Sequence, residues 1–414
     1  MPPKLDRSAT GAYARAAAAV ERAAIWGYAR TVAAEHPWYA ELLDSGGSEE
    51  PPPLVTRELL DRHTVDGVET DDQIAFTTSG AASGKPRRVP WNGEEMALNN
   101  DLKRRQWASH VGERDRVAID VGLGLATHSA SSVFTSLGCQ CLELPFDLQV
   151  GEHIRALAEF FPDVLYSMPS IVDALLAEGR LVRSIERLIL VGEPCSDVWM
   201  KLTADRLGIT VADILDTYGC AEVGLIACGC PVCGRMHFVD EVIPEVVPPD
   251  ALNDEWSAEA LGEAESVLVV TSRFRTGLPI VRFVTYDIVR NFGLERCGES
   301  MRLGVDAVLG RIGDEIKHGE RISVYDIERG VLAVTSEGRY QIVRGRDGRA
   351  RLEFDAATID DQQALAISEA VTATVAAAAA MTNSKLVSPF EVKRVVELAS
   401  PGPSPKRKIV RERV

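Results

Sequence analysis

The stretch FTTSGAASGKPRRVP at residues 76–90 combines hydroxyl side chains and glycines with a lysine. Small residues allow a backbone to approach a ligand closely, and hydroxyl groups together with an ammonium offer hydrogen-bond donors to phosphate oxygens. This composition predicts a phosphate-binding loop. A flexible polar turn can have the same composition, so the interpretation depends on what the rest of the chain contains.

The loop is not one of the two common nucleotide motifs. Three residues instead of the four of the Walker A motif separate Gly80 from Gly84, and Pro86 stands where Ser or Thr would bind Mg²⁺. Proline also cannot continue into a helix interior. The segment DVGLGLAT at 120–127 fails the dinucleotide motif GxGxxG, because Thr127 occupies the third glycine position. The sequence therefore predicts a phosphate loop of another kind.

Length and composition indicate a protein of at least two domains, with 414 residues, 46% hydrophobic and 26% charged. A formal net charge of −16 disfavours binding to nucleic acid or to an anionic membrane. No apolar run approaches the ~18 residues of a membrane span. Charges interrupt the alanines near the N-terminus, which we interpret as a surface helix of a cytoplasmic protein.

Helix and strand patterns alternate through the middle of the chain. Buried-strand candidates occur at 116–124, 163–168 and 184–194, and helical stretches at 171–179 and 198–208 separate or follow them. This alternation predicts a mostly parallel α/β arrangement.

Two further strand candidates, at 266–274 and 278–289, are richer in β-branched residues and are expected to form a separate sheet. After about residue 313 the pattern changes to short strands, an alanine-rich helix and a final strand. These are GVLAV (330–334), RYQIVRG (339–345), ARLEF (350–354), ISEAVTATVAAAAAM (367–381) and FEVKRVVEL (390–398). We therefore predict an α/β protein with a large N-terminal domain of mixed α/β subdomains at 1–313 and a small α+β C-terminal lid domain at 314–414.

Four more segments follow the loop in a fixed order: VGEP (191–194), TYGCAE (217–222), RFVTYD (282–287) and LGRIGDEI (309–316). With the loop and the C-terminal stretch VELASPGPSPKRKIVRE, they resemble the adenylate-forming enzymes, and specifically the phenylacetate–CoA ligase-like branch. Each motif alone is weak evidence for this family. Their joint order along the whole chain is specific.

The resemblance implies a two-step reaction. A carboxylate attacks the α-phosphate of ATP to give an acyl-adenylate and pyrophosphate, and a thiol, usually that of coenzyme A, then displaces AMP. The acid is expected to be aromatic, and segment 122–138 is where this branch builds its acid pocket. Two alternatives stay open: a carrier-protein thiol, an amine or another small nucleophile as acceptor, and a catalytically silent nucleotide-binding homologue. The oligomeric state is also open, with a homodimer as the candidate.

The resemblance also implies roles for individual residues. Glu222 would bind Mg²⁺, a hard cation that prefers oxygen ligands. Asp287 would accept both ribose hydroxyls, with Arg311 beside it, and Lys406 would reach the reacting carboxylate and the α-phosphate. Asp314 would be the hinge of the lid. The adenine would lie between Tyr218 with Gly219 on one side and Gly192, Glu193 and Pro194 on the other. The β- and γ-phosphates would be held by Thr78, Ser79, Gly80, Ser83, Gly84 and Lys85.

Taken singly, these residues have ordinary structural interpretations, such as capping carboxylates, a core tyrosine and a solvated tail lysine. The chain also departs from the family pattern. Ala81, Ala82 and Ser83 lengthen the phosphate loop, Tyr286 replaces the glycine expected before Asp287, and Lys406 competes with Lys408 for the catalytic role.

A cysteine-rich stretch, ACGCPVCGRMHF at 227–238, predicts a metal site. Cys230 and Cys233 are spaced as in a zinc knuckle, and His237 adds an imidazole. By resemblance to zinc-carrying enzymes of this branch, Cys297 would complete the set, and Cys228 is the alternative fourth ligand. Four protein ligands would make the zinc structural, and the alternative is a group of reduced thiols without metal.

Overall fold

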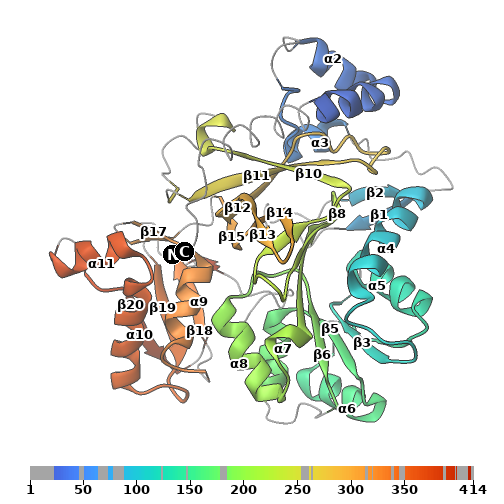
Figure 1. Cartoon of the computed structure of the whole chain (residues 1–414). Helices are drawn as coiled ribbons and strands as arrows, with labels where there is room; N and C mark the ends of the chain where they lie inside the picture. The colour runs from blue at the N-terminus through green and yellow to red at the C-terminus, as the bar shows by residue number, and fades with distance from the viewer. Residues whose placement is uncertain are drawn as a thin grey trace.

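The computed structural model shows a large N-terminal part and a smaller C-terminal part (Figure 1). The residues that the structure describes are 23–45, 51–63, 73–77, 88–122, 125–145, 148–177, 184–252, 261–262, 264–312, 316–318, 320–336, 340–344, 350–385, 388–396, 398 and 409–411. Among the helices of these segments, none is long and apolar enough to cross a membrane.

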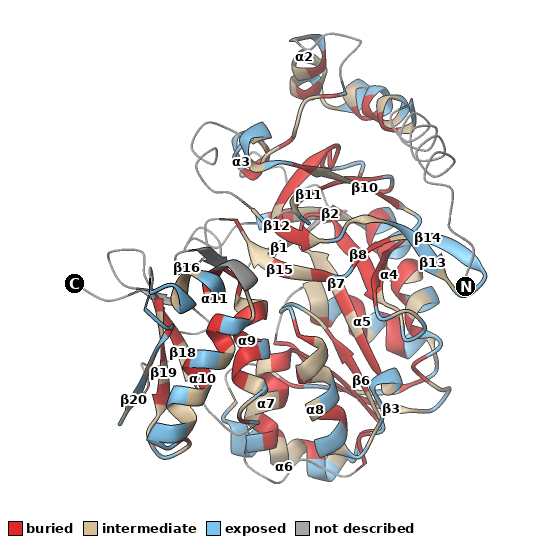
Figure 2. Ribbon diagram, turned by 60° about the vertical axis from the view of Figure 1, so that its left-hand side comes forward, coloured by how far each residue is buried: buried red, intermediate tan, exposed pale blue. Residues whose placement is uncertain are grey.

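A nine-stranded sheet forms the centre of the large part, in the order β13-β14-β9-β8-β7-β6-β5-β3-β4. Its parallel strands are β3 (Arg116–Asp120), β4 (Gln140–Glu143), β5 (Val164–Ser167), β6 (Arg187–Leu190) and β7 (Ile214–Cys220). The connections between them contain α5 (Leu125–Ser136), α6 (Val150–Phe160), α7 (Pro169–Ala177) and α8 (Asp197–Leu207), with the short turn η1 (Val211–Asp213) before β7. The central strands are buried almost throughout, as parallel strands covered by helices must be (Figure 2). The predicted α/β arrangement is confirmed.

Beyond β7 the sheet becomes antiparallel. Its remaining strands are β8 (Gly224–Gly229), β9 (Met236–Phe238), β13 (Gly293–Cys297) and β14 (Ser300–Val305). The β7–β8 hairpin depends on glycine, because a Cβ atom on Gly219 would lie 2.3 Å from the carbonyl oxygen of Gly224. Gly224 itself has a φ of 88°, which side chains rarely adopt.

The predicted separate sheet is present and has four antiparallel strands. They are β10 (Val242–Val247), β11 (Glu265–Ser272), β12 (Phe283–Arg290) and β15 (Ala307–Arg311), with the turn η2 (Pro249–Ala251) after β10. Strand β11 is buried on both faces: Val267 and Val269 join a small cluster around Leu309, whereas Leu268 and Val270 join the main core. Strand β11 therefore lies between the main core and this smaller cluster.

The N-terminal segments pack onto this body. They comprise a helix through residues 23–35, α2 (Pro37–Ser45), α3 (Arg57–His63), the hairpin β1 (Gln73–Thr77)–β2 (Arg88–Asn92) and α4 (Gly93–Trp107). A capping box starts α4, in which the Asn92 side chain accepts from the N–H of Glu95 and the Glu95 carboxylate accepts from the N–H of Asn92. This reciprocal pair fixes where α4 leaves β2.

The C-terminal part has its own sheet, in the order β20-β19-β18-β21, and its own core around Leu352, Phe354, Ile367 and Val371. Its elements are β16 (Ile316–His318), β17 (Glu320–Ile322), α9 (Val324–Leu332), β18 (Tyr340–Arg344), β19 (Ala350–Asp355), α10 (Asp361–Ala373), α11 (Ala376–Asn383), β20 (Glu391–Val395) and β21 (Ile409–Arg411). The small α+β domain is thus present. Its proposed boundary at 313/314 lies outside the described residues.

Two details of this domain differ from the prediction. The strand expected at 330–334 is wrong, because Gly330, Val331 and Leu332 belong to α9, where Ser323 caps the helix and Ile327 and Val331 face the core at helical spacing. The alanine-rich stretch is two helices, α10 and α11, separated at Thr374 and Val375. A short apolar run does not by itself distinguish a strand from a buried helix turn.

Helix α9 docks the small domain onto the large one. Asp326 pairs with Arg290 of β12 at 3.1 Å, and the Glu328 carboxylate accepts from the N–H of Ser196 at 2.8 Å. Arg329 lies 3.3 Å from Asp197 at the start of α8. The small domain is therefore held at the edge of the large domain that carries the VGEP segment.

Candidate active site

The VGEP segment at 191–194 leaves the carboxyl end of β6. Gly192 has a φ of 84°, and Gly192 and Pro194 are exposed. The Glu193 carboxylate accepts from the N–H of Ser170 at 2.9 Å, which fixes the turn against α7. The backbone of this segment is thus open to a ligand from one side.

The TYGCAE segment at 217–222 forms the end of the neighbouring strand β7 and the start of the turn that follows it. Leu190 of β6 pairs with Asp216 of β7 in parallel, so both segments emerge at the same edge of the sheet. Ligands of open α/β sheets bind at this edge, outside the carboxyl ends of the strands. The structure therefore brings these two predicted segments together.

Tyr218, Asp287 and Arg311 form one connected group. The Tyr218 hydroxyl donates to Asp287 Oδ2 at 2.6 Å, and Arg311 Nε lies 3.1 Å from Asp287 Oδ1. Asp287 is 7% exposed. Burial and the Asp287 charge hold the pKa of Tyr218 well above its usual value, and the same carboxylate raises the pKa of Arg311 against the effect of burial. Residues from three strands thus meet at one place.

Tyr286, the departure from the family pattern, takes the conformation that glycine would adopt. Its φ is 63°, in the left-handed region that costs a side chain about 1–2 kcal/mol. Its hydroxyl donates to Glu58 at 2.9 Å, and the Arg57 guanidinium lies 5.5 Å from its ring centre. These contacts stabilise α3 against β12 and offset the backbone strain.

Glu222 lies in the turn after β7 and is buried, with 3% exposure. Its Oε1 lies 3.3 Å from Arg57 Nε, and its backbone carbonyl accepts from Arg275 Nε at 2.8 Å. A carboxylate at this place fits a Mg²⁺ ligand in chemistry. In the structure, however, it is in an ion pair, so a metal would have to share it with Arg57.

Arg275 and Glu95 form a buried ion pair under this turn, which the sequence did not reveal. Both are almost inaccessible to solvent, at 0% and 1% exposure. Arg275 also donates to the carbonyl of Pro90 at 2.7 Å and lies 3.8 Å from the Trp91 ring centre. The pair connects α4 and β2 to the backbone of Glu222.

The predicted residues of the phosphate loop, the hinge and the catalytic lysine lie outside the described residues. These are Thr78, Ser79, Gly80, Ser83, Gly84, Lys85, Asp314, Lys406 and Lys408. Thr77 and Arg88, which flank the loop, pair across the β1–β2 hairpin.

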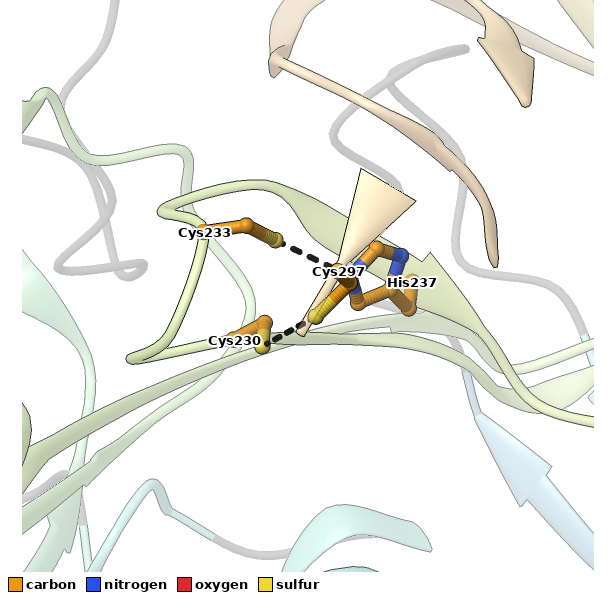
Figure 3. A group of neighbouring side chains, drawn as sticks. All are labelled: Cys230, Cys233, His237 and Cys297. Carbon is orange, nitrogen blue, oxygen red and sulfur yellow. Dashed lines mark hydrogen bonds between the residues drawn. The ribbon is translucent and has the colours of Figure 1, made fainter. Parts of the chain in front are cut away.

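The predicted metal ligands converge at the far end of the antiparallel strands (Figure 3). One ligand atom from each of Cys230, Cys233, His237 and Cys297 lies within 4.8 Å of all the others. The Sγ atoms of Cys230 and Cys297 are 3.5 Å apart, and Cys233 Sγ is 3.1 Å from His237 Nε2. Cys228, the alternative ligand, is instead buried on β8 and is not in this group.

The surroundings of this cluster suit a metal. His237 Nδ1 lies 3.4 Å from the carbonyl oxygen of Leu303, which leaves Nε2 facing the thiols. Burial and nearby arginines lower the pKa of His237, which favours the neutral ligand form. Burial would raise the pKa of Cys230, but backbone N–H groups outweigh it and lower the pKa. The donor set matches a closed tetrahedral zinc site.

Comparison with known proteins identifies the family of the chain. A fumarate–(S)-2,3-diaminopropanoate ligase of Enterobacter agglomerans is 33% identical over 307 residues, which cover 72% of this chain and 77% of that protein. The chain belongs to the adenylate-forming ligases. The predicted resemblance and the prediction of an enzyme are confirmed.

This adenylate-forming ligase also matches more distant members. A phenylacetate–coenzyme A ligase of Pseudomonas putida is 26% identical over 302 residues, covering 68% of this chain and 65% of that protein. The crystal structure of 2-hydroxyisobutyryl-CoA ligase in the postadenylation state has a TM-score of 0.74 at 18% identity, covering 96% and 90% of the two chains. Residues 317–397 match the family of the fumarate–diaminopropanoate ligase C-terminal domain. The fold class is confirmed.

Proposed function

We propose that this ligase uses ATP to activate a carboxylic acid as an acyl-adenylate and then transfers the acyl group to an acceptor. The convergence of Tyr218, Asp287 and Arg311 at the carboxyl edge of the sheet carries the proposal. A buried carboxylate held by one arginine can accept two vicinal ribose hydroxyls while keeping its charge. The exposed backbone of 191–194 lies on the neighbouring strand end, where adenine would stack against Tyr218.

In the first step, an oxygen of the acid forms a bond to the α-phosphorus, and the bond from that phosphorus to the pyrophosphate oxygen breaks. The phosphate loop, with Lys85, would hold the leaving pyrophosphate, and Lys406 would neutralise charge on the α-phosphate. Mg²⁺, held by Glu222, would offset the phosphate charges. Lid rotation about Asp314 would separate the two steps, with the second face of the lid shaping the acceptor path.

For the second step we propose an amine acceptor. The nitrogen attacks the acyl carbon, the bond to AMP breaks, and the amine proton is released. Both the 33% identical relative and the family that matches 317–397 are named for fumarate and diaminopropanoate, a carboxylic acid and a diamine. Coenzyme A is the second candidate, supported by the phenylacetate–coenzyme A ligase relative. The aromatic acid expected from the motifs stays a prediction.

Exchange of labelled pyrophosphate into ATP tests the first step. We expect exchange that depends on Mg²⁺ and on one acid from a panel of aromatic and aliphatic carboxylic acids. Adding coenzyme A or diaminopropanoate to the active mixture then identifies the acceptor by the thioester or amide that forms. Silence with every acid would instead favour a nucleotide-binding homologue without activity.

We also propose that Cys230, Cys233, His237 and Cys297 hold a structural zinc. They join the β8–β9 turn to the β13–β14 hairpin, so the metal would brace the antiparallel end of the main sheet. Four protein ligands leave no position for a substrate.

Removing one ligand should remove the metal. We expect roughly one zinc per chain in the native protein, and a Cys230→Ser variant that loses most of it and melts at a lower temperature. Cys141→Ser, a half-buried thiol on β4, is the matched control and should keep its zinc. Elemental analysis that finds less than about half a zinc per native chain would contradict the site.

A further inference from the structure

Helix α4 has a buried polar face directed into the large domain. Glu95, Asn99 and Lys103 are spaced four residues apart and are 1%, 0% and 6% exposed. Polar residues are rarely buried so completely unless partners satisfy them. Glu95 is satisfied by Arg275, and Asn99 Oδ1 accepts from the N–H of Leu225 at 3.1 Å.

Lys103 is the exception on this face. Its ammonium has three donors, and the structure gives it one hydrogen-bond acceptor, Ser129 Oγ of α5 at 2.8 Å. The Trp107 ring centre lies 5.5 Å away. Among the described residues no carboxylate forms an ion pair with it. A buried ammonium without an anion is costly, so it either loses its proton or takes an anion from a ligand.

The groups around Lys103 are polar but neutral. Ser129 Oγ donates to Asn100 at 2.5 Å and lies 3.4 Å from Asn99 Nδ2. The Trp107 indole N–H is buried and has no hydrogen-bond partner. Donors therefore outnumber acceptors in this group, and an anion would satisfy more of them than water would.

This group lies along β8, the strand that follows Glu222. Asn99 meets β8 at Leu225, shortly after Glu222, and Lys103 lies near Cys228 further along β8. Cys228 pairs across the sheet with Thr217, the residue directly before Tyr218. Eight residues of helix separate Glu95 from Lys103, about 12 Å along α4. The ammonium thus lies about two helical turns along α4 from Glu95 and contacts α5, the segment where the acid pocket was predicted.

We infer that Lys103 binds a second carboxylate of the acid, so that the substrate of this ligase is a dicarboxylic acid. The inference rests on the proposed function and extends it to the substrate class. Ser129 and the Trp107 indole would orient the same carboxylate. The fumarate named for the 33% identical relative is an acid of this class.

The pH dependence follows from the same site. Burial lowers the pKa of Lys103 to about 7, and the neighbouring Cys228 is a neutral thiol because burial raises its pKa to about 12. The charge that binds the second carboxylate is therefore present below pH ~7 and lost as the pH rises. The preference for dicarboxylic acids should decline between about pH 6 and 9.

Acid-dependent pyrophosphate exchange with matched acids tests the inference. The pairs are fumarate and crotonate, succinate and butyrate, and terephthalate and 4-methylbenzoate, each differing in one terminal group. For at least one pair the native protein should have a KM for the dicarboxylic acid about 10–100-fold lower. Lys103→Met should raise that KM by a similar factor and leave the monocarboxylic acid nearly unchanged. Lys393→Met, an exposed lysine of β20, should change neither.

The outcomes are distinct. Equal use of both acids in every pair, or an equal loss for both in Lys103→Met, would overturn the inference and leave adenylation intact. No exchange with any acid would contradict the proposed function itself, and the inference with it. The melting temperature of Lys103→Met shows whether the variant is folded.

Discussion

Replacing Lys406 by alanine is expected to slow adenylation about 100-fold or more. The ammonium would neutralise the negative charge that develops while the acid oxygen attacks the α-phosphorus. Strand β21, which begins three residues later at Ile409, pairs with Ile342 of β18, so this end of the chain is attached to the small domain. The lysine would therefore move with the lid and act only when the lid is closed for the first step. Pyrophosphate exchange measures this loss.

Two comparisons make the Lys406 prediction specific. The same variant should still react at the native rate when the acyl-adenylate is supplied, because the second step does not form the charge that Lys406 neutralises. Lys408→Ala should retain adenylation. If Lys408→Ala loses exchange and Lys406→Ala keeps it, the assignment of the catalytic lysine is wrong.

The parts of the fold that the sequence predicted are those with local signals. Strands β3, β5 and β6 are short apolar runs that turns separate, and their helices follow at regular spacing. The segments that contain Tyr218 and Asp287 were found because their order along the chain is specific. The strand expected at 330–334 failed because an apolar turn of α9 has the same composition as a strand, and its cap, Ser323, was not recognised.

The residues that the sequence did not reveal have partners far away in the chain. Arg275 and Glu95 are 180 residues apart, and Arg57 and Glu222 are 165 apart. Lys103 lies on α4 and its acceptor Ser129 on α5, and neither residue belongs to a sequence motif that would indicate this contact. A charged residue in a single sequence is most simply interpreted as solvent-exposed. Only the three-dimensional packing of the chain shows that these charges are buried.

Replacing Arg275 by methionine is expected to lower the free energy of unfolding by about 3–5 kcal/mol. The variant leaves Glu95 buried at 1% exposure without its partner, and a buried carboxylate is costly unless it is paired. It also removes the hydrogen bond that Arg275 Nε donates to the carbonyl of Glu222. Urea denaturation measures the loss, and adenylation should fall as well because the turn that contains Glu222 loses its support.

A double variant separates the buried charge from simple loss of packing. Replacing both Glu95 and Arg275 by methionine removes the pair together, so it should be less destabilising than Arg275→Met alone, since no unpaired charge remains. An exposed pair on the same helix is the matched control: Arg104→Met breaks the contact with Asp101 and should cost less than about 1 kcal/mol. Equal losses in Arg275→Met and Arg104→Met would show that the buried pair does not stabilise this site, and Glu222 would then owe its position to Arg57 and the hairpin glycines alone.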